Sequence, residues 1–207
     1  MVEISGKYKI GTRRFGSINW IGAWTLYKKE VLRFLIVWIQ TLFSPLITSL
    51  LFLLVLSLAI GNERGDVLGV PFIVFLAPGL IAMQIIQQAF SHSSSSFMIG
   101  KIQGNIVDLL YAPLSAGEVT LAVTLASVTR SVLIAAISLL VFYLFIDLEI
   151  KNFITLIVFT LLSAFSLGAL GIIAGLWAEK FDHMATVTNF IICLLYTSPS
   201  PRDVEES

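Results

Sequence analysis

The sequence predicts an all-α, polytopic membrane protein, and three observations lead to that prediction. The chain of 207 residues is 57% hydrophobic and only 13% charged. Its mean hydropathy is +0.93. A soluble domain contains a far larger share of charged residues, because its surface must be hydrated. Three long stretches contain no Asp, Glu, Lys or Arg, namely residues 34–62, 67–100 and 152–178. Each exceeds the roughly 20 apolar residues that cross the hydrocarbon core of a bilayer.

Basic residues gather before the first of these stretches. Seven of the thirteen Lys and Arg residues lie there: Lys7, Lys9, Arg13, Arg14, Lys28, Lys29 and Arg33. Because positive residues are retained on the cytoplasmic side of membrane proteins, we expect a cytoplasmic N-terminus. Alternation of the spans then places residues 91–115 and 179–183 inside, and residues 62–69 and 147–151 outside.

The first element predicted is a helix on the membrane surface. Residues 1–16 are polar and basic, so we expect a loosely ordered cytoplasmic lead, and Ser17 is the predicted N-cap. Aromatic and apolar residues follow at helical spacing (Trp20, Trp24, Tyr27, Val31 and Phe34). Trp, Tyr and Lys favour the headgroup level, so the expected anchors are Trp20, Trp24, Tyr27, Lys28 and Lys29. The alternative is that this segment simply extends the first span.

Four complete membrane helices and a truncated fifth are expected after the surface helix. They are predicted at residues 36–60 (with Pro45 inside), 71–90, 116–146 and 153–177, and the fifth begins after Asp182. In the second span Gln84, Gln87 and Gln88 share one helix face. The fourth span carries small residues that predict close helix contact. These are Ser163, Ser166, Gly168, Gly171 and Gly175.

Arg130 interrupts the third span. At helical rise it lies about 20 Å from either end, where a charge is costly. It either attracts anionic cargo along a substrate path or is a structural residue, satisfied by Gln84, Gln87, Gln40 or exposed carbonyls. We prefer the structural interpretation, since no intramembrane Asp or Glu of this chain neutralises it and a missing sixth span could hold its partner. Arg130, Gln84, Gln87 and Gln88 are therefore the candidate intramembrane polar residues.

A polar interruption, residues 91–115, lies between the second and third spans. A segment this polar must lie in water or against another protein, which suggests a docking element. Asn105 or Gly104 can open a short helix in it and Pro113 ends that helix. Such a short helix is marginal alone in water, so it needs a partner surface. Its apolar face is predicted from Ile102, Ile106, Leu109, Leu110 and Pro113.

Sequence motifs for nucleotide, metal or hydrolytic chemistry are missing. Gly100-Lys101 is followed by Ile102 and has no glycine five positions earlier, so it is not a phosphate loop. His92 and His183 are the only histidines, and Asp182 is the only carboxylate beside either of them. The serines at 93–96 lack the glycines of a nucleophile elbow. We expect no enzyme activity and no catalytic, cofactor-binding or metal site on this chain.

Five short segments occur in a specific order along the chain. They are residues 76–81 (LAPGLI), 93–97 (SSSSF) and 101–115 (KIQGNIVDLLYAPLS), with supporting matches at 38–42 (WIQTL) and 175–182 (GLWAEKFD). Together they resemble the ABC-2 type transporter permeases, and more narrowly the branch of multidrug or polysaccharide exporters. The resemblance covers about residues 20–190, and members of this family have six spans.

The resemblance implies a permease subunit that pairs with a second copy and binds two separate ATP-hydrolysing subunits, which would hold ATP and Mg²⁺. Drugs or amphiphilic, lipid-linked glycans would move outward across a bacterial inner membrane. Membrane lipid is a further expected partner, and nucleic acid is not. A smaller cytoplasmic contact maps to Glu179, Lys180 and Asp182. The coupling helix maps to Lys101, Ile102, Gln103, Gly104, Asn105, Ile106, Asp108, Leu109, Leu110 and Pro113.

Two alternatives bear on this interpretation. An ion-coupled secondary transporter is the second functional hypothesis, although such proteins usually place carboxylates in their spans. Residues 193–203 (CLLYTSPSPRD) resemble the translation of a transposase sequencing adapter, and a natural Pro/Ser-rich tail is the alternative. We expect the transmembrane domain at 17–192 to be incomplete and residues 193–207 to be non-native. Without them the chain has no cysteine and a net charge of +2.

Overall fold

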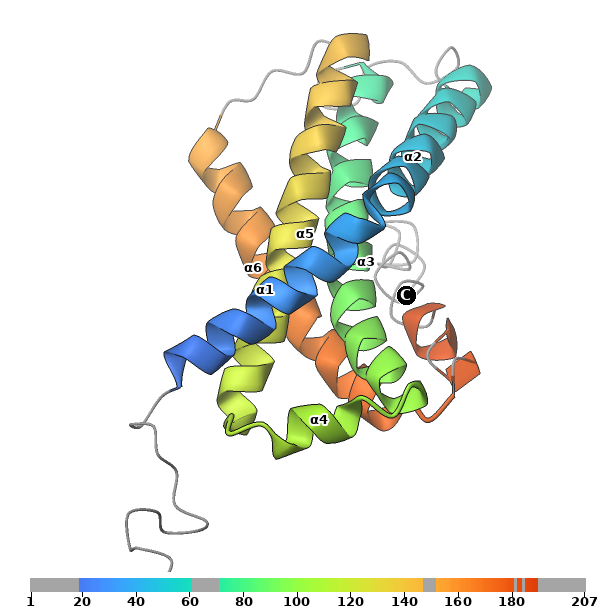
Figure 1. Cartoon of the computed structure of the whole chain (residues 1–207). Coiled ribbons are helices and arrows are strands. Elements are labelled where there is room, and N and C mark those ends of the chain that lie inside the picture. Colours follow the sequence, from blue (N-terminus) through green and yellow to red (C-terminus); the bar gives the residue numbers. More distant parts are fainter. Residues whose placement is uncertain (1–18, 61–70, 147–151, 181, 184, 190–207) are drawn as a thin grey trace, which may run out of the picture.

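The computed structural model describes residues 19–60, 71–146, 152–180, 182–183 and 185–189. Every regular element in these ranges is a helix, which confirms the all-α prediction (Figure 1). The helices are α1 (Trp20–Ile36), α2 (Trp38–Ile60), α3 (Phe72–Ile102), α4 (Ile106–Tyr111), α5 (Ala116–Phe145) and α6 (Phe153–Trp177). Residues 182–183 and 185–189 are also helical. The predicted lead at 1–16, the tail at 193–207 and the end of the fifth span lie outside the described residues.

Four of the described helices are long and apolar enough to cross a membrane. They cover Trp38–Leu58, Phe72–Ile102, Ala116–Phe145 and Phe153–Trp177, in agreement with the four complete spans predicted from the sequence. α1 is a separate helix rather than the start of the first span, because the helical conformation breaks at Val37. In Figure 1 it crosses in front of α5 and α3. The chain is therefore a multi-pass membrane protein.

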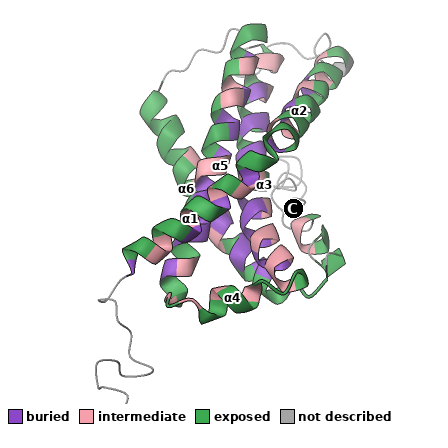
Figure 2. Ribbon diagram, viewed as in Figure 1, coloured by how far each residue is buried: buried purple, intermediate pink, exposed green. Residues whose placement is uncertain are grey.

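α3 is longer than the second span predicted from the sequence. It continues without a break from the predicted end at residue 90 to Ile102, and Figure 2 shows buried residues along much of its length. The prediction that residues 91–115 lie in water or against another protein is therefore wrong for the helical part. His92, Ser93, Ser94, Phe97 and Met98 are buried within this chain.

A polar run can form a buried helix here because its serines satisfy their own hydroxyl groups. Ser93 Oγ donates to the Ala89 carbonyl at 3.1 Å, and Ser95 Oγ donates to the His92 carbonyl at 3.0 Å. Such back-bonding leaves no hydroxyl donor seeking water. The small serine side chains also leave room for a neighbouring helix.

That neighbouring helix is α6, whose glycines approach α3 as the small-residue pattern predicts. A Cβ on Gly171 would lie 2.5 Å from the Phe90 carbonyl oxygen, and one on Gly175 would lie 2.6 Å from the Ser94 carbonyl oxygen. Backbone cannot move aside as a flexible side chain can, so only glycine permits this approach. Of the two serines predicted on this face, Ser166 is exposed and Ser163 is partly buried.

The N-cap of α1 is Asn19, not Ser17, which lies outside the described residues. Asn19 Oδ1 accepts a hydrogen bond from the Gly22 amide at 2.9 Å, and asparagine caps helices as well as serine does. Asn19 also forms two hydrogen bonds to residues far along the chain. Its backbone amide donates to Glu118 Oε1 at 2.5 Å, and its side-chain Nδ2 donates to the Pro113 carbonyl at 3.3 Å. These long-range bonds attach the start of α1 to the segment that leads into α5.

Candidate coupling surface and buried polar network

The short helix α4 forms where the sequence predicts it, from local signals. Gly104 has φ +73°, a conformation that glycine adopts without strain, and Asn105 is the N-cap. At the other end Ala112 is extended, as a residue before proline prefers to be, so the helix stops before Pro113. α4 lies at the bottom of the molecule in Figure 1, between the ends of α3 and α5.

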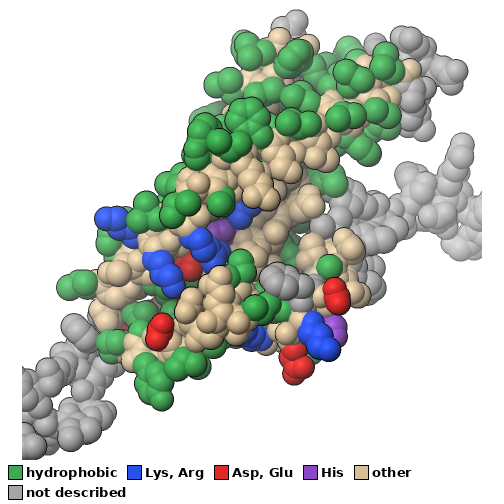
Figure 3. All heavy atoms as spheres, turned by 45° about the vertical axis from the view of Figure 1, so that its right-hand side comes forward, with side chains coloured by type: hydrophobic (Ala, Val, Ile, Leu, Met, Phe, Trp, Pro, Cys, Tyr) green, Lys and Arg blue, Asp and Glu red, His purple; other side chains and the backbone are tan. Residues whose placement is uncertain are grey.

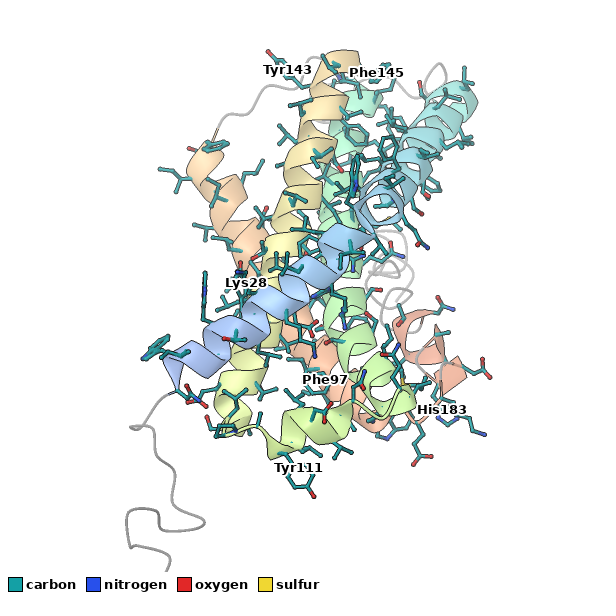
Figure 4. The ribbon with its side chains drawn as sticks, viewed as in Figure 1. Lys28, Phe97, Tyr111, Tyr143, Phe145 and His183 are labelled. Carbon is teal, nitrogen blue, oxygen red and sulfur yellow. The ribbon has the colours of Figure 1, made fainter. Side chains whose placement is uncertain are left out.

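The two faces of α4 differ from the single apolar face predicted. Ile106 and Leu109 are partly buried against the cluster that contains Leu26, Phe97 and Val123, so they face the protein. The outward face contains Leu110 of the predicted apolar face together with Val107 and Tyr111, which the prediction did not include. Val107 is 48% exposed, Leu110 76% and Tyr111 85%, and Figure 4 shows Tyr111 pointing away from the helices. We call Val107, Leu110 and Tyr111 the outer face of α4.

The other residues assigned to the coupling helix by resemblance lie around this outer face. Ile102, Gln103, Gly104, Asn105, Asp108 and Pro113 are exposed. Lys101 differs from them, because its Nζ donates to the Ala178 carbonyl at 3.0 Å and also to the Leu176 carbonyl. The predicted second contact, Glu179, Lys180 and Asp182, is exposed immediately after α6.

The segment after α4 is held to α1 and α5 by a capping box. Ser115 Oγ accepts from the Glu118 amide at 3.3 Å, and Glu118 Oε2 accepts from the Ser115 amide at 2.6 Å. The other oxygen of this buried carboxylate accepts from the Asn19 amide. A cleft of about 110 Å³ lies beside α4 and is lined by residues of α1, α3, α4 and α5. Hydrogen bonds therefore hold the segment after α4 to the starts of α1 and α5.

Arg130 lies in a buried polar network that joins α5 to α3. Its Nη2 donates to Gln88 Oε1 at 2.8 Å, and its Nη1 lies 3.3 Å from His92 Nδ1. Because a guanidinium only donates, His92 Nδ1 is the acceptor of this bond. Arg130 therefore bonds to side chains of α3, as the structural interpretation requires. Its partners are Gln88 and His92, not the Gln84, Gln87 or Gln40 named from the sequence.

The network continues to α1 through Glu30, which sequence reasoning missed. Glu30 Oε2 accepts from Ser96 Oγ at 2.9 Å, pairs with Arg33 Nη2 at 3.0 Å and lies 3.9 Å from His92 Nε2. The Glu30 side chain is 5% exposed, and it is linked to Arg130 through His92 rather than by a direct contact. The spacing of the residues could have predicted that Glu30 is buried. Leu26, Glu30 and Phe34 recur every fourth residue and form the buried side of α1.

Helix length places this network near one membrane surface. At 1.5 Å per residue, α3 and α5 are each about 45 Å long, against a hydrocarbon core of about 30 Å. Counted from Phe72 on α3 and Phe145 on α5, a core of that thickness has its other boundary near Ser91 on α3 and Ala126 on α5. Arg130 then lies about 6 Å inside that boundary rather than at mid-membrane. Figure 3 shows the charged side chains in the lower part of this face and mostly hydrophobic ones in its upper part.

The three glutamines of α3 have three different environments. Gln84 is buried, its Nε2 donates to the Pro45 carbonyl of α2 at 2.9 Å and its Oε1 accepts from Ser138 Oγ of α5 at 2.6 Å. Gln88 binds Arg130, whereas Gln87 is exposed. Their shared helix face therefore does not act as one polar surface.

The predicted anchors of α1 divide between its two sides. Trp20 is 74% exposed and Trp24 66%, and Lys28 and Lys29 are also exposed. Tyr27 faces the protein instead, because its hydroxyl lies 2.9 Å from Thr129 Oγ1 of α5. The outward tryptophans and lysines are the residue types that favour the headgroup level.

Comparison with known proteins identifies the family. The profile of the ABC-2 type transporter family matches residues 22–199. "Inner membrane transport permease YadH" of Escherichia coli strain K12 is 28% identical to this chain over 175 residues, which are 84% of this chain and 68% of that relative. Proteins of the same name from E. coli O157:H7 and Shigella flexneri match to the same extent. No solved structure gives a significant match. The chain belongs to the ABC-2 type transporter family.

Proposed function

We propose that this chain is the transmembrane permease subunit of an ATP-driven exporter, energised by a separate ATPase subunit that docks on α4. Its membership of the ABC-2 type transporter family supports an ATP-binding-cassette partner. The sequence contains no phosphate loop, so ATP and Mg²⁺ bind to the partner and this subunit is not an enzyme. The cargo proposed is a drug or an amphiphilic, lipid-linked glycan.

The observation that carries this proposal is the outer face of α4. Val107, Leu110 and Tyr111 expose large apolar surface on a helix that also exposes Asp108 and follows the exposed Gln103 and Asn105. α4 lies about 15 Å beyond the hydrocarbon core by the helix lengths given above, so lipid does not cover this face. Exposed apolar and aromatic residues outside the membrane are typical of a protein interface.

The inner face of α4 supports transmission of force from that interface. Ile106 and Leu109 pack on Leu26 of α1 and on Val123 of α5. The bond between Asn19 and Glu118 adds a polar attachment between the same two helices. A displacement of α4 by the ATPase would therefore act on α3, which leads directly into α4, and on the cluster through which α4 meets α1 and α5.

The charge distribution supports a cytoplasmic position for α4 and for the N-terminus. Seven basic residues precede the first span, and α1 carries Lys28, Lys29 and Arg33 close to the level of the network. An inner-membrane location is supported by the name of the E. coli relative. Trp20 and Trp24 would then contact the inner leaflet.

A second permease copy is part of the proposal. Gln87 is exposed on α3, about 22 Å from Phe72 and therefore at hydrocarbon depth. An amide facing lipid costs free energy unless it finds a partner, so this position favours protein or a water-filled path over lipid. A dimer interface that encloses the export path would satisfy Gln87. Arg130 is assigned a structural role because its described partners belong to this chain.

Family membership favours the ATP-driven mechanism over an ion-coupled secondary transporter. The described buried carboxylates are Glu30, which lies on α1 and is paired with Arg33, and Glu118, which lies in the first turn of α5 and accepts from the backbone amides of Asn19 and Ser115. A carboxylate held in an ion pair is a poor site for a coupling ion, because the guanidinium already neutralises it.

The proposal is tested by removing the outer face of α4. Leu110→Ser with Tyr111→Ser should weaken binding of the ABC ATPase from a neighbouring reading frame by about 2 kcal/mol or more, about 30-fold in Kd. Binding would be titrated on permease in nanodiscs. The matched control is Leu144→Ser with Tyr143→Ser, a similarly exposed pair at the opposite end of α5, which should bind as the unsubstituted permease does. Equal binding by both double variants would contradict the assignment.

A further inference from the structure

The C-terminal end of α6 lacks a positive charge of its own. The last carbonyls of a helix have no partner within it and carry the negative end of the helix dipole. α6 has no basic residue in its last turn, and its C-cap Ala178 uses its amide to bond the Ala174 carbonyl. The carbonyls of Leu176 and Ala178 are therefore open to a donor from water or from elsewhere in the fold.

Lys101 of α3 is that donor. Its ammonium group has three N–H donors and contacts both the Leu176 and the Ala178 carbonyl oxygens. Ala178 is fully buried and Lys101 is partly buried, so solvent screens this contact less than it would a surface pair. The backbones are also held close together one turn earlier, where Gly175 of α6 meets Ser94 of α3.

The position of Lys101 in the chain gives this contact a wider consequence. Lys101 lies in the last turn of α3, Gln103 caps that helix and α4 begins at Ile106. On the other side, Glu179 follows Ala178 directly and starts the second cytoplasmic segment. One ammonium group thus joins the two cytoplasmic segments where they leave the membrane helices.

We infer that Lys101 is a positioning residue that makes α4 and the end of α6 one mechanical unit, so that an ATPase docked on α4 also moves α6. The inference rests on the proposed function for its partner, but the contact itself belongs to this chain alone. Lys101 therefore acts on the transport cycle through α6 rather than by touching the ATPase.

Hydrogen–deuterium exchange on permease in nanodiscs tests the contact directly. Lys101→Met keeps the length and the apolar stem of the side chain but removes the charge. Amides 175–178 should then exchange about 2- to 5-fold faster, the range expected for loss of a charge at a helix C-terminus. Lys101→Arg should restore slow exchange. The control is Lys28→Met, since Lys28 is an exposed lysine on α1. Unchanged exchange in Lys101→Met would overturn the inference.

Adding the ABC ATPase from a neighbouring reading frame tests the mechanical unit. In the unsubstituted permease, binding should slow exchange both in residues 106–111 and in residues 175–178, which precede the predicted second contact. In Lys101→Met, only residues 106–111 should remain protected, and Lys101→Arg should recover both. Protection of both segments in Lys101→Met would overturn the coupling role. If the ATPase protects neither segment of the unsubstituted permease, the proposed function fails, whereas exchange in the free permease still decides whether Lys101 holds α6.

Discussion

Two groups of polar side chains bond α3 to the neighbouring helices, and the two groups differ in chemistry. We call them the upper and the lower junction. The upper junction is Gln84, a neutral amide whose two ends bond to Pro45 of α2 and Ser138 of α5. The lower junction is the network of Glu30, Arg33, Ser96, His92, Arg130 and Gln88, which joins α1, α3 and α5. By the helix lengths given above, the upper junction lies at hydrocarbon depth and the lower one near the boundary of the core on the side of α4.

The two junctions also differ in how completely they are satisfied. Both functional ends of Gln84 are bonded, whereas His92 Nε2 and Arg130 Nε are buried without a hydrogen-bond partner. Within hydrocarbon a neutral, fully matched pair is the inexpensive way to attach helices, while charges belong close to water. The upper junction is therefore a fixed attachment, whereas in the lower one the Glu30 carboxylate pairs with Arg33 and Arg130 bonds to Gln88 and His92.

Removing that carboxylate should have the largest effect on stability. Glu30→Ala leaves Arg33 without its carboxylate and Ser96 without its acceptor, and breaking a buried ion pair costs about 3–5 kcal/mol. Because Arg33 is 32% exposed, we expect a loss near the lower end of that range. The measurement is the free energy of unfolding in mixed micelles. Glu30→Gln retains an acceptor for Ser96 and should lose less.

Arg33→Ala is the matched control for the Glu30 variants. Its side chain is partly solvated, so water compensates part of its loss and the free energy of unfolding should fall less than in Glu30→Ala. An Arg33→Ala loss equal to that of Glu30→Ala would show that the network depends on the pair itself and not on the carboxylate.

Removing the upper junction should have a smaller effect. Gln84→Leu replaces the amide by an apolar side chain of similar size and gives up two interhelical hydrogen bonds. Such bonds contribute about 0.6 kcal/mol on average in membrane proteins and about 1.7 at most, so a loss of about 1 kcal/mol is expected in the same assay. Gln87→Leu, at an exposed position of the same helix, should change stability by less than about 0.5 kcal/mol. A Gln84→Leu loss larger than that of Glu30→Ala would reverse the comparison.

The features that the sequence predicted are those that depend on residues near one another in the chain. The four spans follow from stretches without charge, and α4 follows from Gly104, Asn105 and Pro113 within ten residues. The glycines of α6 predicted a close helix contact because small residues at one face serve no other purpose in a membrane helix.

The features that the sequence did not predict depend on residues far apart. Glu30 and Ser96 are 66 residues apart in the sequence, and Asn19 and Glu118 are 99 residues apart. A pattern of neighbouring residues therefore cannot predict either contact. The polar run after residue 90 suggested a loop because its serines were counted as water-seeking. In the fold they bond to their own helix and face glycines, which makes the same residues suited to burial.

The docking of an ATPase on α4 is tested most directly by cross-linking from the two ends of the molecule. Tyr111 on α4 is 85% exposed and Tyr143 at the far end of α5 is 62% exposed (Figure 4). Each would be replaced in turn by a photoreactive phenylalanine derivative in membranes that contain the permease and the ATPase. A cross-link to the ATPase should form from position 111 and not from position 143. A cross-link from position 143, or none from position 111, would contradict the proposed coupling surface.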